Sequence, residues 1–239
     1  MADTPSRNGA AMPESLEHAL AATEFIDHAS AEVGQFVADV LPDGGRDDKD
    51  RAVRLYYAVR DKIGYEIYGA DLSRRGLTAS RTLRLGRGLC IHKSLVYLAA
   101  LRSVGIPGRL VLTDVRNHLA SDRIRTYIGG DVFHYHALTS VHLDGRWVRA
   151  TPVFNKLMCR LYGIEPLEFD GTADSVHHPY RGDGARHMEF LHEHGEFDDL
   201  PHQQVLDGMR HHHPDIIVGP DRDRFAPGSL VADATGRSA

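Results

Sequence analysis

The sequence predicts an α+β fold, with helices in its first half and antiparallel strands after them. Up to Gly105, apolar residues recur three or four positions apart, which is the spacing of a buried helix face. Past Gly108 the apolar pattern changes to that of strands. Asp144-Gly145, between two such runs, is a strong signal for a two-residue hairpin turn. These observations place helices and a β-hairpin in one chain.

The length of 239 residues suits one domain with tails. We expect this domain at residues 14–215, with its core motifs in 50–155 and a less legible extension in 156–215. Residues 1–13 are small and polar without a period, which predicts a disordered leader. Residues 216–239 predict a flexible tail.

Capping and terminating residues predict the boundaries of the first helices. Ser30 can cap a helix that Pro42 ends. After a charged loop at residues 43–50, a second helix is expected with these residues facing inward: Val53, Tyr56, Val59 and Ile63. Residues 65–87 contain several glycines and arginines and predict an irregular segment, with a short helix near Ser80.

The next helix begins at Cys90, and Gly105 followed by Pro107 ends it. Its expected buried face consists of Ile91, Leu95, Leu98 and Leu101. A thiol at a helix N-terminus lies among unpaired N–H groups at the positive end of the helix dipole, and both favour the thiolate. Cys90 is therefore a candidate nucleophile. The alternative is a buried core cysteine.

The hairpin allows a register to be predicted. Residues 110–113 and 132–143 are expected strands, 117–130 a polar loop, and 147–151 the partner of the longer strand. If Leu143 pairs with Arg146, Leu138 lies opposite Thr151. Because side chains alternate between the two faces of a strand, the following residues share a face with Thr151: His134, His136, Leu138, Ser140 and His142. His136 would lie diagonal to Thr151, about 7 Å away between Cβ atoms. Farther on, residues 156–162 and 203–209 predict short helices among loops.

Two motifs resemble those of the transglutaminase-like superfamily. G-L-C at 88–90, followed by A-A-L-R-S-V-G-I-P-G-R at 99–109, resembles its nucleophile helix. His136-Ala137 and Gly145-Arg146-Trp147-Val148 resemble its histidine strand and return turn. The resemblance implies a papain-like α+β fold, with the nucleophile cysteine at the N-terminus of a helix that packs on an antiparallel sheet. It also implies a Cys–His–Asp triad for acyl transfer or amide hydrolysis.

The third triad position departs from the family pattern. The family's aspartate follows the tryptophan by four residues and precedes a proline, and Thr151 holds that position here. A threonine hydroxyl can accept the histidine N–H but brings no charge to stabilise an imidazolium. Three alternatives stay open: Thr151 orients His136, Asn155 does so as an amide, or the site is impaired.

The resemblance thus implies Cys90 as nucleophile, His136 as general base and acid, and Thr151 as orienting group. The expected reaction proceeds through a thioester, with protease- or amidase-like hydrolysis, as in bacterial relatives, favoured over cross-linking. The alternative is an impaired domain that binds a peptide or protein. A peptide or protein is the expected substrate, whereas nothing in the sequence indicates its identity or the oligomeric state.

The composition of the chain disfavours some classes of function. A net charge of −5 gives no excess of basic residues that would indicate nucleic-acid binding. No apolar run is long enough to span a membrane, and the N-terminus lacks the apolar region of a secretory signal. Two cysteines form no disulfide framework, which predicts the cytoplasm. Calcium ligands are not apparent in the sequence, so we expect neither a metal nor another cofactor.

Other polar residues receive two interpretations each. A metal site on His134, His136 and His142 is disfavoured, because residues two apart on a strand are about 7 Å apart and no second cysteine or carboxylate has ligand spacing. Lys93 could support the thiolate or be solvated, and Asp114 or Asp131 could replace the missing carboxylate or be loop residues. The remaining expectations are a buried Cys159, solvated His211, His212 and His213, loop histidines at 177, 178, 192 and 194, and Arg81, Arg84 and Arg87 as an anion site or a solvated loop.

Overall fold

The computed structural model describes residues 14–118, 120–176, 188–216, 230–231 and 235. The helices are α1 Glu14–His18, α2 Ala31–Val40, α3 Asp48–Lys62, α4 Ala79–Leu85, α5 Cys90–Ser103, α6 Asp122–Ile128, α7 Lys156–Tyr162 and α8 His202–His212. The strands are β1 Gly64–Tyr65, β2 Arg87–Gly88, β3 Gly108–Asn117, β4 Val132–Leu143, β5 Arg146–Ala150 and β6 Met188–Phe197. The predicted α+β class is confirmed.

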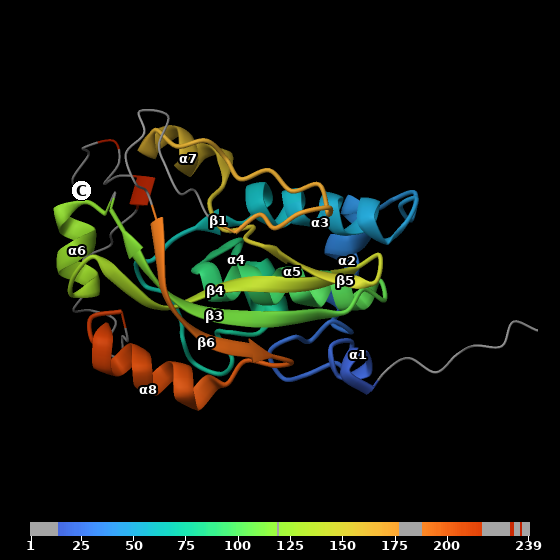
Figure 1. Ribbon diagram of the computed structural model, residues 1–239, viewed down its shortest axis with the longest axis horizontal. Coiled ribbons are helices and arrows are strands. Elements are labelled where there is room, and N and C mark those ends of the chain that lie inside the picture. The colour runs from blue at the N-terminus through green and yellow to red at the C-terminus, as the bar shows by residue number, and fades with distance from the viewer. Residues whose placement is uncertain (1–13, 119, 177–187, 217–229, 232–234, 236–239) are drawn as a thin grey trace, which may run out of the picture.

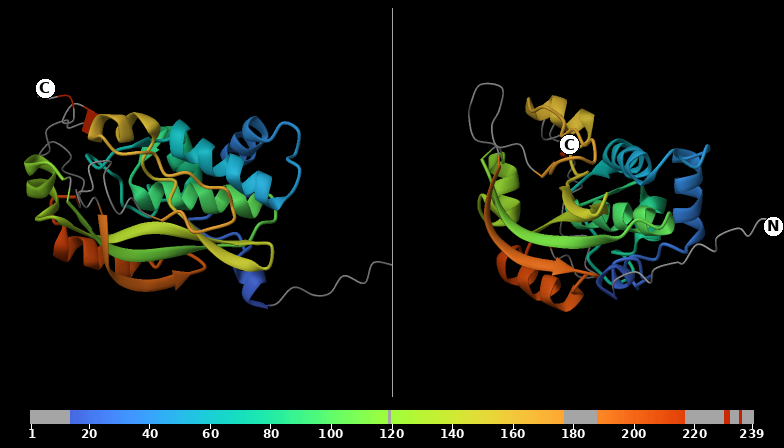
Figure 2. Two further views of the ribbon diagram at one scale, coloured as in Figure 1. Left: turned by 45° about the horizontal axis from the view of Figure 1, so that its top comes forward. Right: turned by 45° about the vertical axis from the view of Figure 1, so that its right-hand side comes forward.

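The larger sheet is antiparallel, with the strand order β5-β4-β3-β6. Helices α2 to α5 lie on one side of this sheet, and α8 lies on the other (Figures 1 and 2). β2, which directly precedes α5, forms a short parallel pair with β1. The expected leader lies outside the described residues, as does the expected tail apart from residues 216, 230, 231 and 235. The domain boundaries stay a prediction.

The predicted helix starts agree with the structure because the capping residues act locally. The Ser30 hydroxyl accepts the N–H of Val33 at the start of α2. Thr78 caps α4 in the same way, and Gly86 closes that helix in the left-handed conformation. In α6, which lies within the predicted polar loop, Ser121 is the cap. This seven-residue helix was missed because its short sequence carries many charges and little apolar period.

Helix α5 is buried on all sides, whereas the sequence predicted one buried face. Every residue from Cys90 to Arg102 is buried. Several of its polar side chains donate to backbone carbonyls, as when Tyr97 donates to Ala52 O at 3.0 Å and Arg102 to Asp198 O at 2.6 Å. The sheet covers one side of α5 and the other helices cover the rest (Figure 2). This helix is therefore the centre of the core.

The predicted hairpin is confirmed. Leu143 pairs with Arg146, and the turn residues Asp144 and Gly145 have φ angles of 50° and 80°, as a type I′ turn requires. β6, in contrast, was expected to be a loop. Its sequence MEFLHEHGEF has no clear alternation, and it is a strand because its backbone pairs along β3.

Within the part of the chain that the structure describes, no helix is both long and apolar enough to cross a membrane.

Candidate active site

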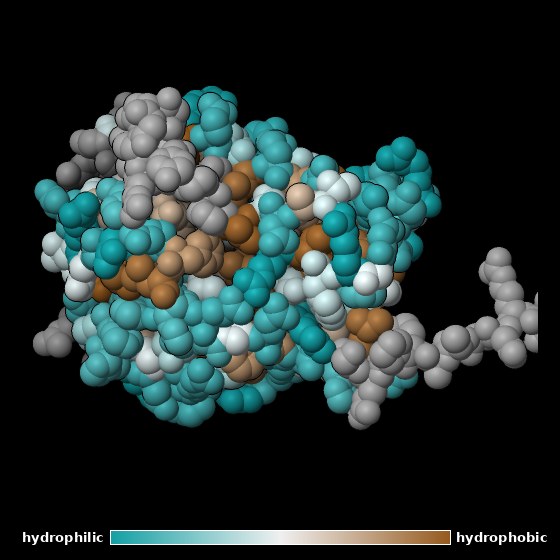
Figure 3. All heavy atoms as spheres, in the orientation of Figure 1, coloured by the Kyte–Doolittle hydropathy of each residue, from teal (hydrophilic) through white to brown (hydrophobic). Residues whose placement is uncertain are grey.

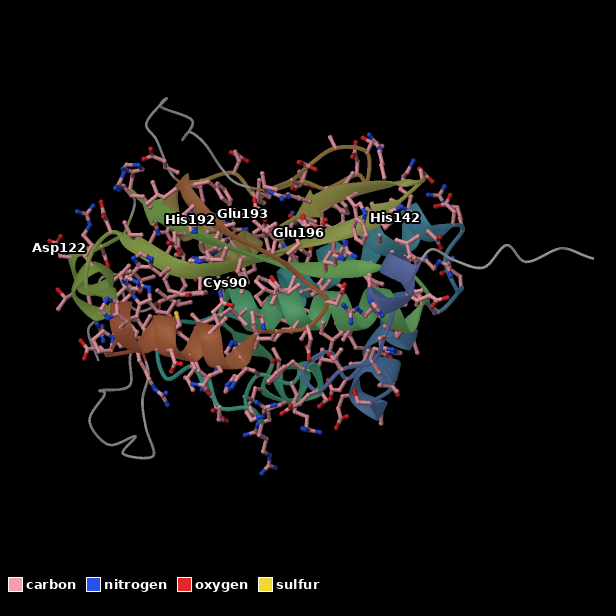
Figure 4. The ribbon with its side chains drawn as sticks, turned by 60° about the horizontal axis from the view of Figure 1, so that its bottom comes forward. Cys90, Asp122, His142, His192, Glu193 and Glu196 are labelled. Atoms are coloured by element: carbon pink, nitrogen blue, oxygen red, sulfur yellow. The ribbon has the colours of Figure 1, made fainter. Side chains whose placement is uncertain are left out.

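Cys90 is fixed at the first turn of α5, where that helix meets β4. The thiol is fully buried, and it contacts hydrogen-bonding backbone groups of Ala137, Ile91 and Cys90 itself. One turn later, Ser94 Oγ donates to Ala137 O at 3.2 Å. Figure 4 shows Cys90 near the end of α5, beneath the sheet. The nucleophile candidate thus lies beside the residue that follows His136.

A β-bulge sets the direction of His136. The β3–β4 register shifts between Thr113 and Val115, and Tyr135 has a φ of 57°. Such a bulge interrupts the alternation of side chains. His136 therefore lines an apolar pocket together with Phe133, whereas His134 pairs with Asp114 elsewhere. The predicted common face for His134 and His136 is wrong for this reason.

Burial keeps both members of the candidate pair neutral. It raises the pKa of the Cys90 thiol to about 11, although the backbone groups of Ala137, Ile91 and Cys90 oppose the rise. Burial also lowers the pKa of His136 to about 4. These pKa values correspond to a neutral thiol and a neutral imidazole near pH 7, whereas a helix N-terminus by itself favours the thiolate. Loss of water around the thiol outweighs the helix dipole here.

Among the described residues, no hydrogen bond joins Thr151 to His136. The Thr151 hydroxyl donates to Val176 O at 2.9 Å. Asn155 caps α7, and its side-chain oxygen accepts the N–H of Met158 at 2.8 Å. Nε2 of His136 is buried and has no hydrogen-bond partner in the described part of the chain. The role of Thr151 as orienting group stays a prediction.

An apolar pocket lies at His136. Tyr65 lines it, and its hydroxyl interacts electrostatically with Cys90. Burial raises the pKa of Tyr65 well above its usual value. The other lining residues are Ile67, Val115, Asn117, Ile124, Ile128, Phe133, Phe154, Met158, Tyr162, Ile164, Met188 and Leu230. Figure 3 shows hydrophobic atoms gathered on the side of the molecule where α6 and α7 lie.

Asp114 is neither a loop residue nor a partner of His136 in the described structure. It lies on β3 and accepts Nε2 of His194 at 2.6 Å, while His134 Nδ1 lies 2.9 Å from its other oxygen. Its pKa is lowered because the hydrogen bonds from His194, Tyr135 N and His134 outweigh the opposing effect of burial. His194 was expected in a loop, and it is instead a β6 residue stacked on Tyr135 at 4.2 Å. Asp131 pairs with Arg116 at 3.5 Å.

Two polar residues of α5 have structural roles. Lys93, expected to be solvated or to support a thiolate, is fully buried and donates to Arg60 O and Ile63 O at 2.9 and 2.6 Å. Burial lowers its pKa to about 7. His92 Nδ1 accepts the N–H of Leu89 at 3.2 Å, so its Nε2 donates to Asp71 O at 3.1 Å.

The remaining sequence candidates divide between core and surface. Cys159 is buried, as predicted. Of the three histidines at 211–213, His213 is fully buried rather than solvated. His192 lies on β6 (Figure 4), and residues 177 and 178 lie outside the described part of the chain. Arg84 pairs with Glu32, while Arg81 and Arg87 line a second, polar hollow with His92. Among the described residues, no group of three or more His, Cys, Asp or Glu side chains could hold a metal ion.

Residues 35–152 match the family model of the transglutaminase-like superfamily. This core of the chain belongs to the transglutaminase-like superfamily. The matched region of this transglutaminase-like protein runs from α2 to the end of β5 and includes Cys90, His136 and Thr151.

Two further comparisons concern the transglutaminase-like chain as a whole. No curated protein matches it. A crystal structure from Cytophaga hutchinsonii, described as a "Putative Cysteine Protease", is similar over 59% of this chain and 43% of that chain, with 13% identity and a TM-score of 0.46. The chain thus spans less than half the length of that protein.

Proposed function

We propose that this transglutaminase-like protein is a cysteine enzyme that cleaves an amide or other acyl bond, with Cys90 as nucleophile. The supporting observation is that the thiol lies against the backbone of Ala137, next to His136, whose buried Nε2 has no partner among the described residues. A buried polar atom without a partner costs free energy. Its place at an apolar pocket, one residue before the Ala137 backbone that contacts the Cys90 thiol, favours a role in chemistry.

In the proposed reaction, Cys90 Sγ attacks the acyl carbon while its proton moves to the imidazole of His136. Proton transfer accompanies attack because the resting pair is neutral. The first N–H groups of α5, at Cys90 and Ile91, lie beside the thiol and would stabilise the oxyanion. Collapse breaks the bond to the leaving group, which takes the proton from His136 and leaves a thioester on Cys90.

Water is the proposed acceptor of the acyl group. It attacks the thioester carbon while giving a proton to His136, and His136 returns this proton to Cys90 Sγ as the C–S bond breaks. The acid leaves and the thiol is restored. Hydrolysis is favoured over cross-linking because no Asp or Glu among the described residues lines the pocket at His136. A cationic amine would lose its hydration there without gaining a counter-charge. We propose a peptide or protein as the substrate.

Thr151 is the proposed orienting residue for His136. Its hydroxyl hydrogen is directed to Val176 O, so the oxygen retains a lone pair that can accept an imidazole N–H. Such a hydrogen bond would fix the tautomer of His136 without adding charge, which agrees with a mechanism that starts from a neutral imidazole.

Acylation by p-nitrophenyl esters of N-acetyl amino acids tests the proposal. We expect a burst of one p-nitrophenol per chain and a hydroxylamine-sensitive adduct on Cys90, found by mass spectrometry. Cys90→Ala should abolish the burst, and His136→Ala should slow acylation by about 10² to 10⁴. Cys159→Ala, which removes the other buried thiol, should leave the burst intact. An adduct-free Cys90, or a His136→Ala variant that acylates as fast as the parent, would overturn the proposal.

A non-catalytic peptide-binding domain is the second candidate. It is favoured by Thr151 in place of an aspartate and by the pKa of His136, which burial lowers to about 4. It predicts reversible peptide binding that Cys90→Ala leaves unchanged, and no acyl-enzyme.

A further inference from the structure

The wall of the apolar pocket at His136 includes a side chain from the far end of the same sequence. Leu230 is one of its lining residues and is only 2% exposed. The adjacent Val231 is 40% exposed. Leu230 and Val231 form a short segment, red in Figure 1, on the side of the molecule where α6 and α7 lie. Burial therefore distinguishes Leu230 from its neighbour.

The backbone of Leu230 is also held. Its N–H lies 3.2 Å from Glu66 Oε2 and 3.4 Å from Oε1. Glu66 Oε1 additionally accepts the N–H groups of Ile67 and Tyr68 at 3.0 and 3.1 Å. Glu66 follows Tyr65, which pairs with Gly88 two residues before Cys90. Leu230 is thus attached to the segment that borders the candidate nucleophile.

We propose that this pocket is a subsite for a leucine-like side chain of the acyl substrate, and that Leu230, an apolar residue of its wall, competes with that side chain for the pocket. This inference rests on the proposed function and specifies its substrate. Leu230 lines the pocket together with Ile67, Phe154 and Met158, so the lining is apolar and suits an aliphatic side chain. A substrate with an apolar side chain gains the burial that Leu230 now has, so substrate and Leu230 compete for the pocket.

The competition predicts a difference between two esters. N-acetyl-leucine p-nitrophenyl ester uses the pocket, whereas N-acetyl-glycine p-nitrophenyl ester has no side chain to place there. We expect kcat/KM for acylation of Cys90 to be at least about tenfold higher for the leucine ester. Leu230→Ala should lower KM for the leucine ester several-fold and leave the glycine ester unchanged. Val231→Ala is the matched control and should change neither.

Glu66→Gln provides a second variant, because a neutral amide oxygen accepts the Leu230 N–H less strongly than a carboxylate. It should lower KM for the leucine ester in the same direction as Leu230→Ala. Equal kcat/KM for the two esters in the parent and in Leu230→Ala would overturn the subsite while leaving the proposed function intact.

Failure of the proposed function is recognised separately. If neither ester acylates Cys90, calorimetry still measures the affinity of N-acetyl-leucine amide for the parent and for Leu230→Ala. Tighter binding to Leu230→Ala, and no binding of N-acetyl-glycine amide, would support the subsite without catalysis. Equal or absent binding of the leucine amide to both chains would overturn it.

Discussion

The backbone N–H of His134 donates to Nε2 of His213 at 2.8 Å. Nδ1 of the same ring lies 2.6 Å from Ile128 O, so it carries the hydrogen. His213 therefore joins the end of α8 to both β4 and α6, and it does so only as a neutral imidazole. Protonation of Nε2 would remove the acceptor for His134.

This arrangement predicts a loss of stability in acid. Burial lowers the pKa of His213 from 6.5 to about 4. The folded state then binds fewer protons than the unfolded state between these values, so the stabilisation is complete above pH 6.5 and falls as the pH drops toward 4. The contribution is about 3 kcal/mol at most. Urea unfolding from pH 8 to 4 should show a shallower decline in His213→Gln than in the parent, and His211→Gln should decline like the parent.

Gly208 of α8 allows close contact with β4. A Cβ at this position would lie 2.0 Å from Cε2 of Tyr135, a ring that also stacks on His194. Gly208→Ala should therefore lower the free energy of unfolding by about 1 to 3 kcal/mol, although alanine favours helix. Gly34, an exposed glycine of α2 where an added Cβ would meet nothing within 4 Å, is the control. Gly34→Ala should raise the free energy of unfolding by up to about 1 kcal/mol. Thermal unfolding should therefore show a lower midpoint for Gly208→Ala and a higher one for Gly34→Ala than for the parent.

Lys93 supports the C-terminal end of α3 from inside the core. Its Nζ donates to the carbonyls of Arg60 and Ile63. Lys93→Ala leaves a cavity and two unsatisfied carbonyls, so the free energy of unfolding should fall by about 3 kcal/mol. Lys93→Met keeps the volume and should cost less. The exposed Lys62 is the comparison, and Lys62→Ala should change stability by no more than about 0.5 kcal/mol. A solvated Lys93 would make the two alanine variants alike.

The pH dependence of the alkylation rate of Cys90 tests whether burial raises the pKa of its thiol. Because burial raises its pKa to about 11, reaction with iodoacetamide should keep accelerating well above pH ~8.5, the pKa of a free thiol. The measurement is made in Cys159→Ala, since burial raises the pKa of Cys159 to about 11 as well. A rate that reaches its plateau below that pH would contradict this prediction and indicate a thiolate in the resting protein.

Local signals in the sequence determined much of this fold. Ser30 and Thr78 cap their helices through contacts with residues three positions away, and Asp144-Gly145 fixes the hairpin through its own φ angles. The end of α5 at Ser103 agrees with the stop signal of Gly105 and Pro107 in the same way. Such features depend on a few neighbouring residues, so they can be read from the chain.

The tertiary structure decided what surrounds those elements. β6 is a strand because β3 supplies its hydrogen-bond partners, and its own sequence has no strand period. His136 faces the pocket because Tyr135 occupies a bulge, and burial rather than the helix dipole dominates the pKa of Cys90. Leu230 reaches the same pocket from 94 residues beyond His136 in the sequence numbering. Desolvation and long-range packing depend on which distant segments meet, and no local pattern carries that information.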